Sequence, residues 1–204
     1  FFFLKMHLFF HNNLFKKRYF SFLLAVLPFS FIAGNMIINI NTILILLSAL
    51  IVFNKNLFHQ QFFLLDKLLF FYFSLVIISG FIGDYYFYSN ALYWNGLLAT
   101  TIKSFLFLKF LLLYLILRYL VENEILIFKY FFITCAASSV FVCFDIFYQF
   151  INGEDIFGFK YYGSGRKLGG PFGDELIAGS FIQRFSLFSF FLIPLFYNQK
   201  FKKY

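Results

Sequence analysis

Long apolar runs separated by short polar segments dominate the sequence. Several of them are long enough to cross the roughly 30 Å hydrocarbon core of a lipid bilayer. Spans are predicted at residues 19–33, 36–53, 64–82, 102–120, 125–147 and 175–196. The first is short and contains Pro28, and Gly34-Asn35 separates it from the second, so these two are expected to form a kinked, tight helical hairpin. The predicted fold class is all-α: a polytopic transmembrane helical bundle of about six spans, in one domain covering residues 1–204.

The composition supports a membrane protein. Hydrophobic residues make up 62% of the 204 residues and charged residues only 13%, whereas about a quarter of a soluble domain is charged. Phenylalanine alone occurs 39 times. Because these rings follow the apolar runs, they are interpreted as lipid-facing or packing residues.

The distribution of charge predicts the orientation in the membrane. The net charge is +8, and the basic residues gather in short segments beside the spans, as the positive-inside rule requires. A nucleic-acid-binding protein would instead gather them on one soluble face, so no nucleic-acid partner is expected. Both termini are predicted to be cytoplasmic. The loops near residues 84–101 and 150–174 then face outward, which in a bacterium with two membranes means the periplasm.

The polar stretch from residue 145 to 184 interrupts this apolar pattern. Polar, irregular backbone in a membrane protein lies outside the lipid or lines a wet cavity. Glycines at 163, 165, 169 and 170 permit unusual backbone shapes, and Pro171 suits a first helical turn. Lys160, Arg166 and Lys167 form a basic group suited to phosphate oxygens. The alternative is an ordinary solvated loop.

Nearby acids and cations have structural explanations as well as functional ones. Asp174 and Glu175 are expected in the first turn of the last span, where acids suit the helix dipole. Arg184 lies inside that span, either as a buried or snorkelling charge or as a cavity-facing cation for an anionic substrate. Lys109, inside the fourth span, is expected to be structural. Asp145 is a candidate neutralising partner for either cation.

Known catalytic and metal-binding spacings are missing from the sequence. It contains no Walker A, HExxH or GxSxG pattern. Cys135 and Cys143 are eight residues apart on one predicted helix, too far for a disulfide, and belong to no metal-ligand spacing.

The residues around this stretch resemble a known family. The run Asp145-x-x-x-Gln149-x-x-x-Gly153-x-Asp155-x-x-Gly158, then Arg166-x-x-Gly169-x-x-Phe172-Gly173-Asp174-Glu175 and Gly179-Ser180-Phe181, is similar to the outer-loop signature of the O-antigen ligase and O-antigen polymerase superfamily. The Pro-containing first span and the run GNMIININTILILLSALIVF also fit this family. The resemblance covers most of the chain, and its most specific part is about forty residues from Asp145.

The resemblance implies a function. Members are multi-pass glycosyltransferases of the bacterial inner membrane that take a glycan from undecaprenyl diphosphate at the periplasmic face, in lipopolysaccharide or other surface polysaccharide biosynthesis. Ligases transfer it to the lipid A core and polymerases to another repeat unit, and neither a metal nor another cofactor is expected. The implied catalytic residues are Arg166, which holds the diphosphate, and more weakly Arg184. The implied substrate-binding residues are Lys160, Lys167, Gln149, Asp174 and Glu175.

The chain also departs from this family. Members are about twice as long, with a large periplasmic loop and further spans downstream, so the sequence is expected to be an N-terminal half that is inactive alone. The alternative function is a non-enzymatic membrane transporter or exporter subunit whose cations line a path, although no internal repeat is found. A purely structural membrane subunit would leave Arg184 and the glycine-rich loop unexplained.

Overall fold

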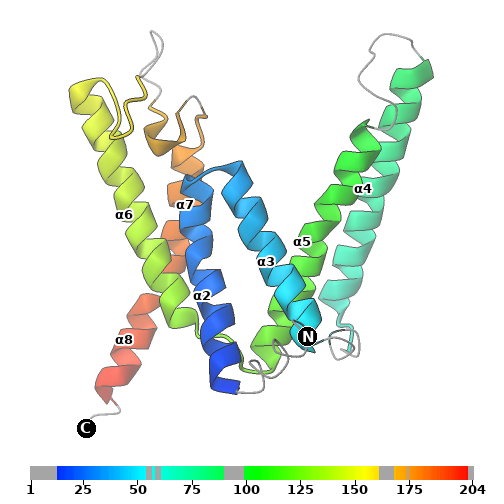
Figure 1. The fold of residues 1–204 in the computed structure, drawn as a ribbon, viewed down its shortest axis with the longest axis horizontal. Helices are drawn as coiled ribbons and strands as arrows, with labels where there is room; N and C mark the ends of the chain where they lie inside the picture. The colour runs from blue at the N-terminus through cyan, green and yellow to red at the C-terminus, as the bar shows by residue number, and fades with distance from the viewer. Residues whose placement is uncertain are drawn as a thin grey trace, which may run out of the picture. The chain divides into compact units, whose positions relative to one another are not determined.

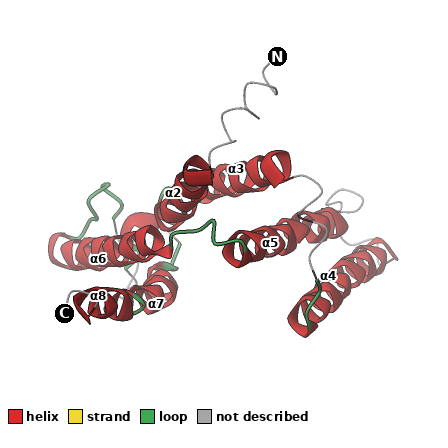
Figure 2. Ribbon diagram, turned by 90° about the horizontal axis from the view of Figure 1, so that it is seen from below, coloured by secondary structure: helices red, strands yellow, loops and turns green. Residues whose placement is uncertain are grey.

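The computed structural model describes residues 13–53, 57, 61–89, 99–160, 168–173 and 175–201. Regular structure in these residues is helical, apart from one isolated β-bridge, as Figures 1 and 2 show. The elements are α2 (Asn13–Ile32), α3 (Asn35–Phe53), α4 (Leu64–Ser89), α5 (Ala99–Glu122), α6 (Phe128–Asn152), the short 3-10 helix η2 (Gly170–Phe172), α7 (Ala178–Ser189) and α8 (Leu192–Phe201). The predicted all-α fold class is confirmed.

Within the described residues, five helical stretches are long and apolar enough to cross a membrane. They are Asn35–Phe53, Leu64–Tyr86, Thr100–Glu122, Phe128–Asn152 and Ala178–Phe196. The chain is therefore a multi-pass membrane protein. The orientation of its termini stays a prediction.

Helix α2 was expected to be a sixth span, but it is not among these five stretches. Its first turns contain Lys16, Lys17 and Arg18. The apolar remainder, residues 19–32, covers only about 21 Å at roughly 1.5 Å per residue, against a hydrocarbon core of roughly 30 Å. The helix forms as predicted and continues through Pro28, but its apolar length does not match the bilayer.

The chain divides into two compact units. One comprises Phe1–Ile45 and Glu124–Tyr204, and the other Leu46–Asn123. Helices α2, α6, α7 and α8 belong to the first unit, α4 and α5 to the second, and α3 contributes to both. The expectation of a single domain stays a prediction.

In the first unit, α6 packs against α2 and α7. The side chains of Phe20 and Leu24 are buried on α2, and the Ile127 N–H at the start of α6 donates to Ser21 Oγ at 2.8 Å. The turn between α2 and α3 places Gly34 at φ +104°, a conformation that favours glycine. The predicted break between these two helices is thus found at the predicted position.

A buried amide joins α3 to α2. Asn41 Nδ2 donates to Leu23 O and to Ser30 Oγ, each at 3.2 Å, and the side chain of Asn41 is only 5% exposed. Interhelical hydrogen bonds of this kind contribute to helix association where the hydrophobic effect between helices is absent.

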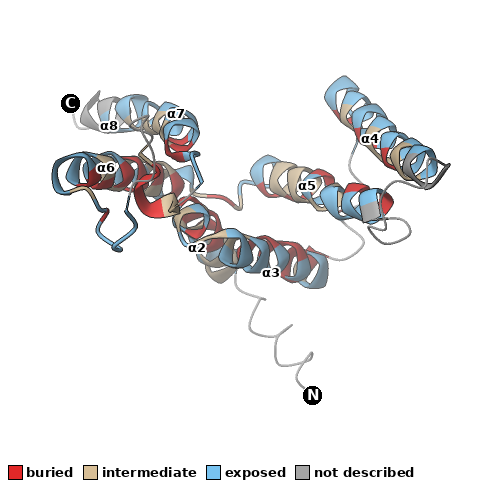
Figure 3. Ribbon diagram, turned by 90° about the horizontal axis from the view of Figure 1, so that it is seen from above, coloured by how far each residue is buried: buried red, intermediate tan, exposed pale blue. Residues whose placement is uncertain are grey.

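In the second unit, a narrow seam joins α4 to α5. The buried residues Asp66, Phe73 and Gly80 on α4 are seven residues apart and therefore share one face. A Cβ at Gly80 would lie 2.2 Å from Ser104 Oγ, so the helices approach closely there. Most of the remaining surface of α4 is exposed, as Figure 3 shows, which suits a helix surrounded by lipid.

Aspartates hold both ends of this pair of helices. At one end, Asp84 accepts hydrogen bonds from the backbone N–H groups of Thr100 at 3.0 Å and Thr101 at 2.7 Å. These are N–H groups of the first turn of α5, which have no partner within their own helix. Asp84 therefore caps α5 from α4.

At the other end, Asp66 and Arg118 form an ion pair. Asp66 is 0% exposed and also accepts from Tyr114 Oη at 3.0 Å and from the Phe63 N–H at 2.6 Å. Arg118 Nε donates to Glu122 Oε1 at 2.7 Å, and the guanidinium lies 4.4 Å from the centre of the Phe63 ring. Arg118, predicted only as a topology-setting charge, is thus also a packing residue.

The last predicted span is broken into two helices. Helix α7 ends at Ser189, and α8 begins at Leu192. The N–H groups of Phe190 and Phe191 bond to carbonyls three residues earlier, and Pro194 in the first turn of α8 has no N–H to donate. The continuous helix expected over residues 175–196 therefore has an interruption.

Removing the arginine of the ion pair should destabilise the second unit. Arg118→Ala leaves the Asp66 carboxylate buried without its cation, and truncating one partner of such a pair costs about 3–5 kcal/mol. We expect a lower unfolding midpoint for the purified protein in detergent, measured by thermal unfolding. The control is Lys67→Ala, which removes an exposed cation from α4, the helix of Asp66. Equal midpoints for both variants would mean that the Asp66–Arg118 ion pair does not stabilise the second unit.

Candidate functional site

The buried face of α6 extends from the packed interior of the first unit to the predicted outer loop. Six of the seven buried residues on this helix are spaced alternately by four and three positions, which places them on one face. They are Phe131, Cys135, Ser138, Val142, Asp145 and Gln149. The character of this face changes along the helix, because its last two members are polar. Asp145 and Gln149 are 0% and 1% exposed.

Helix α6 ends five residues beyond the predicted span, which stops at residue 147. Its last residue is Asn152, and Gly153 follows at φ 81°. The Gly153 N–H donates to Gln149 O at 2.9 Å, a C-terminal cap that glycine forms most readily. Gly153 is therefore the stop that its sequence position predicted.

Residues 153–160, called the α6 turn below, fold the chain back on itself. The Gly158 N–H donates to Asp155 O, and the Asp155 N–H to Phe159 O, both at 3.0 Å. Glu154 and Lys160 form an isolated antiparallel bridge. Gly158 has φ 86°, so this tight turn requires the glycine at that position.

Two carboxylates hold the α6 turn in place. Asp145 Oδ1 accepts from the Ile156 N–H at 2.9 Å, and Asp155 Oδ1 accepts from the Phe159 N–H at 2.6 Å. Asp155 is 2% exposed. The first bond attaches the turn to the helix, and the second closes the turn on itself.

The amide of Gln149 connects the α6 turn to a second segment. Its Nε2 donates to Phe159 O at 3.2 Å, and its Oε1 accepts from the Gly170 N–H at 3.0 Å. Both ends of the amide are therefore used by backbone groups that are far apart in the sequence. A side chain with one donor and one acceptor end is required for this arrangement.

The second segment, residues 168–173, is called the glycine segment. Gly170 has φ +56°, and a Cβ there would lie 3.0 Å from Ile146 Cγ1 and 3.6 Å from Asp145 Oδ2. A Cβ at Gly169 would lie 2.0 Å from Gly173 O. The expectation of unusual backbone in the glycine-rich stretch is confirmed here, and the reason is close approach to α6. Pro171 lies in η2, which fits the predicted helical first turn.

The predicted site residues differ in how the structure places them. Lys160 is exposed at the end of the α6 turn. Gln149 is buried and engaged by backbone, an arrangement that supports a positioning role, and its contact with a substrate stays a prediction. Outside the described residues lie Arg166, Lys167 and Asp174.

The expectation that Glu175 lies in the first turn of the last span is wrong. Helix α7 begins at Ala178, and no acidic residue lies in its first turn. Glu175 is exposed and precedes the helix, and its N–H donates to Phe172 O at 3.2 Å. The backbone turns of the glycine segment continue through Ile177, which delays the helix start.

Arg184 lies on the exposed face of α7. Ala178, Phe181 and Phe185 are the buried residues of this helix, whereas Arg184 is exposed. It is therefore not the buried charge that one interpretation predicted. Asp145 does not neutralise it, because within the described part of the chain Asp145 bonds only to the Ile156 N–H. A role of Arg184 toward an anionic substrate stays a prediction.

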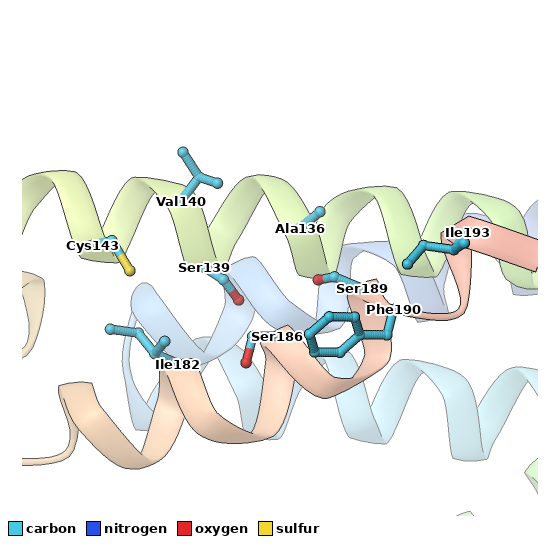
Figure 4. Close-up of a pocket in the computed structure, with 9 residues that line it drawn as sticks. All are labelled: Ala136, Ser139, Val140, Cys143, Ile182, Ser186, Ser189, Phe190 and Ile193. Atoms are coloured by element: carbon cyan, nitrogen blue, oxygen red, sulfur yellow. The ribbon is translucent and has the colours of Figure 1, made fainter. Parts of the chain in front are cut away.

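A largely apolar pocket of about 460 Å³ lies between α6 and the α7–α8 region. Figure 4 shows its lining, to which Ser139 and Cys143 contribute from α6 and Ser186 from α7. Ser139 Oγ is buried and has no hydrogen-bond partner among the described residues. Cys143 is exposed. Arg184 does not line this pocket.

The sequence did not predict that Asp155 and Gly170 would shape this site. Asp155 was recognised only as part of a spaced pattern, and Gly170 only as one of several glycines. The alternating spacing of buried residues on α6 was a usable signal for Asp145 and Gln149, because it continues the apolar face. No local pattern indicates that Gly170 is the glycine that meets the Gln149 amide.

Comparison with known proteins finds no matching family model, no matching curated protein and no matching solved structure. The resemblance to the O-antigen ligase and polymerase superfamily therefore rests on the quoted residues alone.

Replacing Gln149 should release the glycine segment from the α6 turn. Gln149→Leu keeps a similar volume but leaves the buried Gly170 N–H without an acceptor, at a cost of about 1–3 kcal/mol. We expect faster amide hydrogen exchange at Gly170 and in residues 155–160, measured by mass spectrometry. Asn152→Leu, an exposed position on the same helix, should leave these rates unchanged. Protection equal to wild type in Gln149→Leu would refute the bridge.

A Cβ at Gly170 should be poorly tolerated. Gly170→Ala forces alanine to a positive φ, at about 1–2 kcal/mol, and crowds Ile146. Gly179→Ala is the matched control, because nothing lies within 4 Å of a Cβ there and its φ is not positive. We expect a lower thermal midpoint for Gly170→Ala only. Similar midpoints for the two variants would mean that position 170 does not require glycine.

Proposed function

We propose that this protein is an O-antigen ligase-like or polymerase-like glycosyltransferase of the bacterial inner membrane. It moves a glycan from undecaprenyl diphosphate, at the periplasmic face, to the lipid A core or to another glycan. The proposal rests on one observation: three residues of the pattern that resembles this family bond to the same loop. Asp145, Gln149 and Asp155 each bond to the backbone of the loop that the resemblance points to.

The two anchored segments lie on either side of the predicted cations. The α6 turn ends at Lys160, and the glycine segment begins at Leu168. Only residues 161–167 connect them, and Arg166 and Lys167 are the last of these. Both neighbouring segments are anchored on α6. This anchoring supports a role for the basic connection between them in binding a substrate.

Such a loop suits a diphosphate leaving group. When the glycosyl bond to the diphosphate breaks, negative charge develops on the departing oxygen. A guanidinium forms two parallel hydrogen bonds to phosphate oxygens and keeps its charge. Arg166 is the residue proposed for this role, with Lys160 and Lys167 adding positive charge for binding.

The pocket beside α6 supports a lipid-linked substrate. A polyprenyl chain needs an apolar path next to the site that holds its diphosphate. The lining residue Cys143 precedes Gln149 by six residues on α6, about 9 Å along the helix axis. The pocket therefore lies next to the anchored loop and deeper along the same helix, where a lipid tail would run.

A transporter or exporter subunit is the second candidate. The break between α7 and α8 favours it, because interrupted membrane helices form substrate sites in many transporters. The two candidates differ in their product. A transferase changes the covalent state of the glycan, whereas a transporter changes only its location.

Arg166→Ala in the natural gene should abolish glycan transfer. Losing one preorganised group that stabilises developing charge typically costs about 100- to 1,000-fold in rate. We expect loss of surface-glycan ladders on gels from cells that depend on this protein, with normal membrane insertion on immunoblots. Missing capped chains would indicate a ligase, and chains with a single repeat a polymerase.

Lys103→Ala is the matched control for this experiment. Lys103 is an exposed cation near the start of α5, predicted on the same side of the membrane but outside the resemblance. It should support normal ladders. Normal ladders from Arg166→Ala would refute the proposal, and accumulation of unchanged glycan on the cytoplasmic side would favour the transporter.

A further inference from the structure

Two buried carboxylate oxygens near the end of α6 have no partner. Asp145 Oδ2 and Asp155 Oδ2 are inaccessible to solvent, and neither forms a hydrogen bond in the described part of the chain. Each residue uses its other oxygen to accept a backbone N–H. Buried polar atoms in folded proteins nearly always have partners, so an orphaned pair needs an explanation.

The two carboxylates belong to one small region. Asp145 accepts a hydrogen bond from the N–H of Ile156, the chain neighbour of Asp155. Asp145 Oδ2 also lies close to the backbone of Gly170, where a Cβ would come within 3.6 Å. Two like charges therefore share a region closed to water.

No described side chain supplies the missing positive charge. The side chain of Lys160, on the same turn, is exposed and makes no ion pair with either carboxylate. The Gln149 amide is already used by Phe159 and Gly170. Uncompensated buried carboxylates cost several kcal/mol each, so either a bound cation or a proton must neutralise them.

We propose that Asp145 and Asp155 bind a hard divalent cation, Ca²⁺ in first place, between the end of α6 and the α6 turn. Carboxylate oxygens are the preferred ligands of such ions, and backbone carbonyls and water complete their shells. Among the described residues no group of three or more His, Cys, Asp or Glu side chains gathers, which disfavours zinc. Ca²⁺ accepts irregular geometry more readily than Mg²⁺.

The cation would join the helix to the turn that it carries. Asp145 belongs to α6 and Asp155 to the α6 turn, so one ion bound by both would fix the turn and remove the repulsion between them. This inference does not depend on the proposed transferase activity, because the site is defined by the orphaned oxygens.

Thermal unfolding of the whole purified chain in detergent tests the proposal. After treatment with a chelator, Ca²⁺ is added at constant ionic strength. We expect the midpoint to rise by roughly 3–6 °C when Ca²⁺ is at ten times its dissociation constant. Equilibrium dialysis with radioactive Ca²⁺ should show one ion bound per chain.

Variants separate this site from other acidic groups. Asp145→Asn and Asp155→Asn should each abolish the Ca²⁺-dependent rise, whereas Glu154→Gln, an exposed acid on the same turn, should keep it. The wild-type titration decides the question even where a variant fails to fold.

Three outcomes would overturn the proposal. A wild-type midpoint that ignores Ca²⁺ but rises as the pH falls would mean that a proton neutralises the pair. A midpoint that ignores both, with destabilisation by Lys160→Met, would mean that the chain supplies its own cation. Unchanged Ca²⁺ binding in the double variant Asp145→Asn/Asp155→Asn would place the ion elsewhere.

Discussion

The two hydrogen bonds of the Gln149 amide hold together the polar end of the first unit. One end of the amide binds Phe159 in the α6 turn, and the other binds Gly170 in the glycine segment. Without this bridge, two loop segments ten and twenty-one residues away from the helix position would have no common attachment. A buried amide that satisfies backbone groups on both sides is costly to replace, because an apolar substitute leaves at least one of them unpaired.

Polar contacts also determine how the helices of the second unit pair. Apolar surface cannot select one helix pairing over another in lipid, since lipid tails are as apolar as the side chains. Polar contacts at the two ends of α4 therefore carry much of the specificity. Asp84 caps the first turn of α5, and Asp66 binds Arg118. Between them, Gly80 allows close approach to Ser104.

These contacts give the proposed site a physical basis that composition alone does not. The residues that suggested a glycan transferase are the ones that fold the loop, so the resemblance and the geometry concern the same positions. Gln149 bonds to backbone groups and therefore positions the loop. The cations have a different proposed role, which is to bind the diphosphate. The orphaned oxygens of Asp145 and Asp155 add a second requirement for positive charge at this end of α6.

The sequence by itself determined the helical class, the positions of five membrane-length helices and the stops at Gly34 and Gly153. These follow from hydropathy and glycine chemistry, which act over a few residues. Only the tertiary structure decided that α7 starts after Glu175, that Arg184 is exposed and that Gly170 meets Gln149. Such facts depend on which distant backbone groups meet, and a buried hydrogen bond between segments leaves no periodic trace in the sequence.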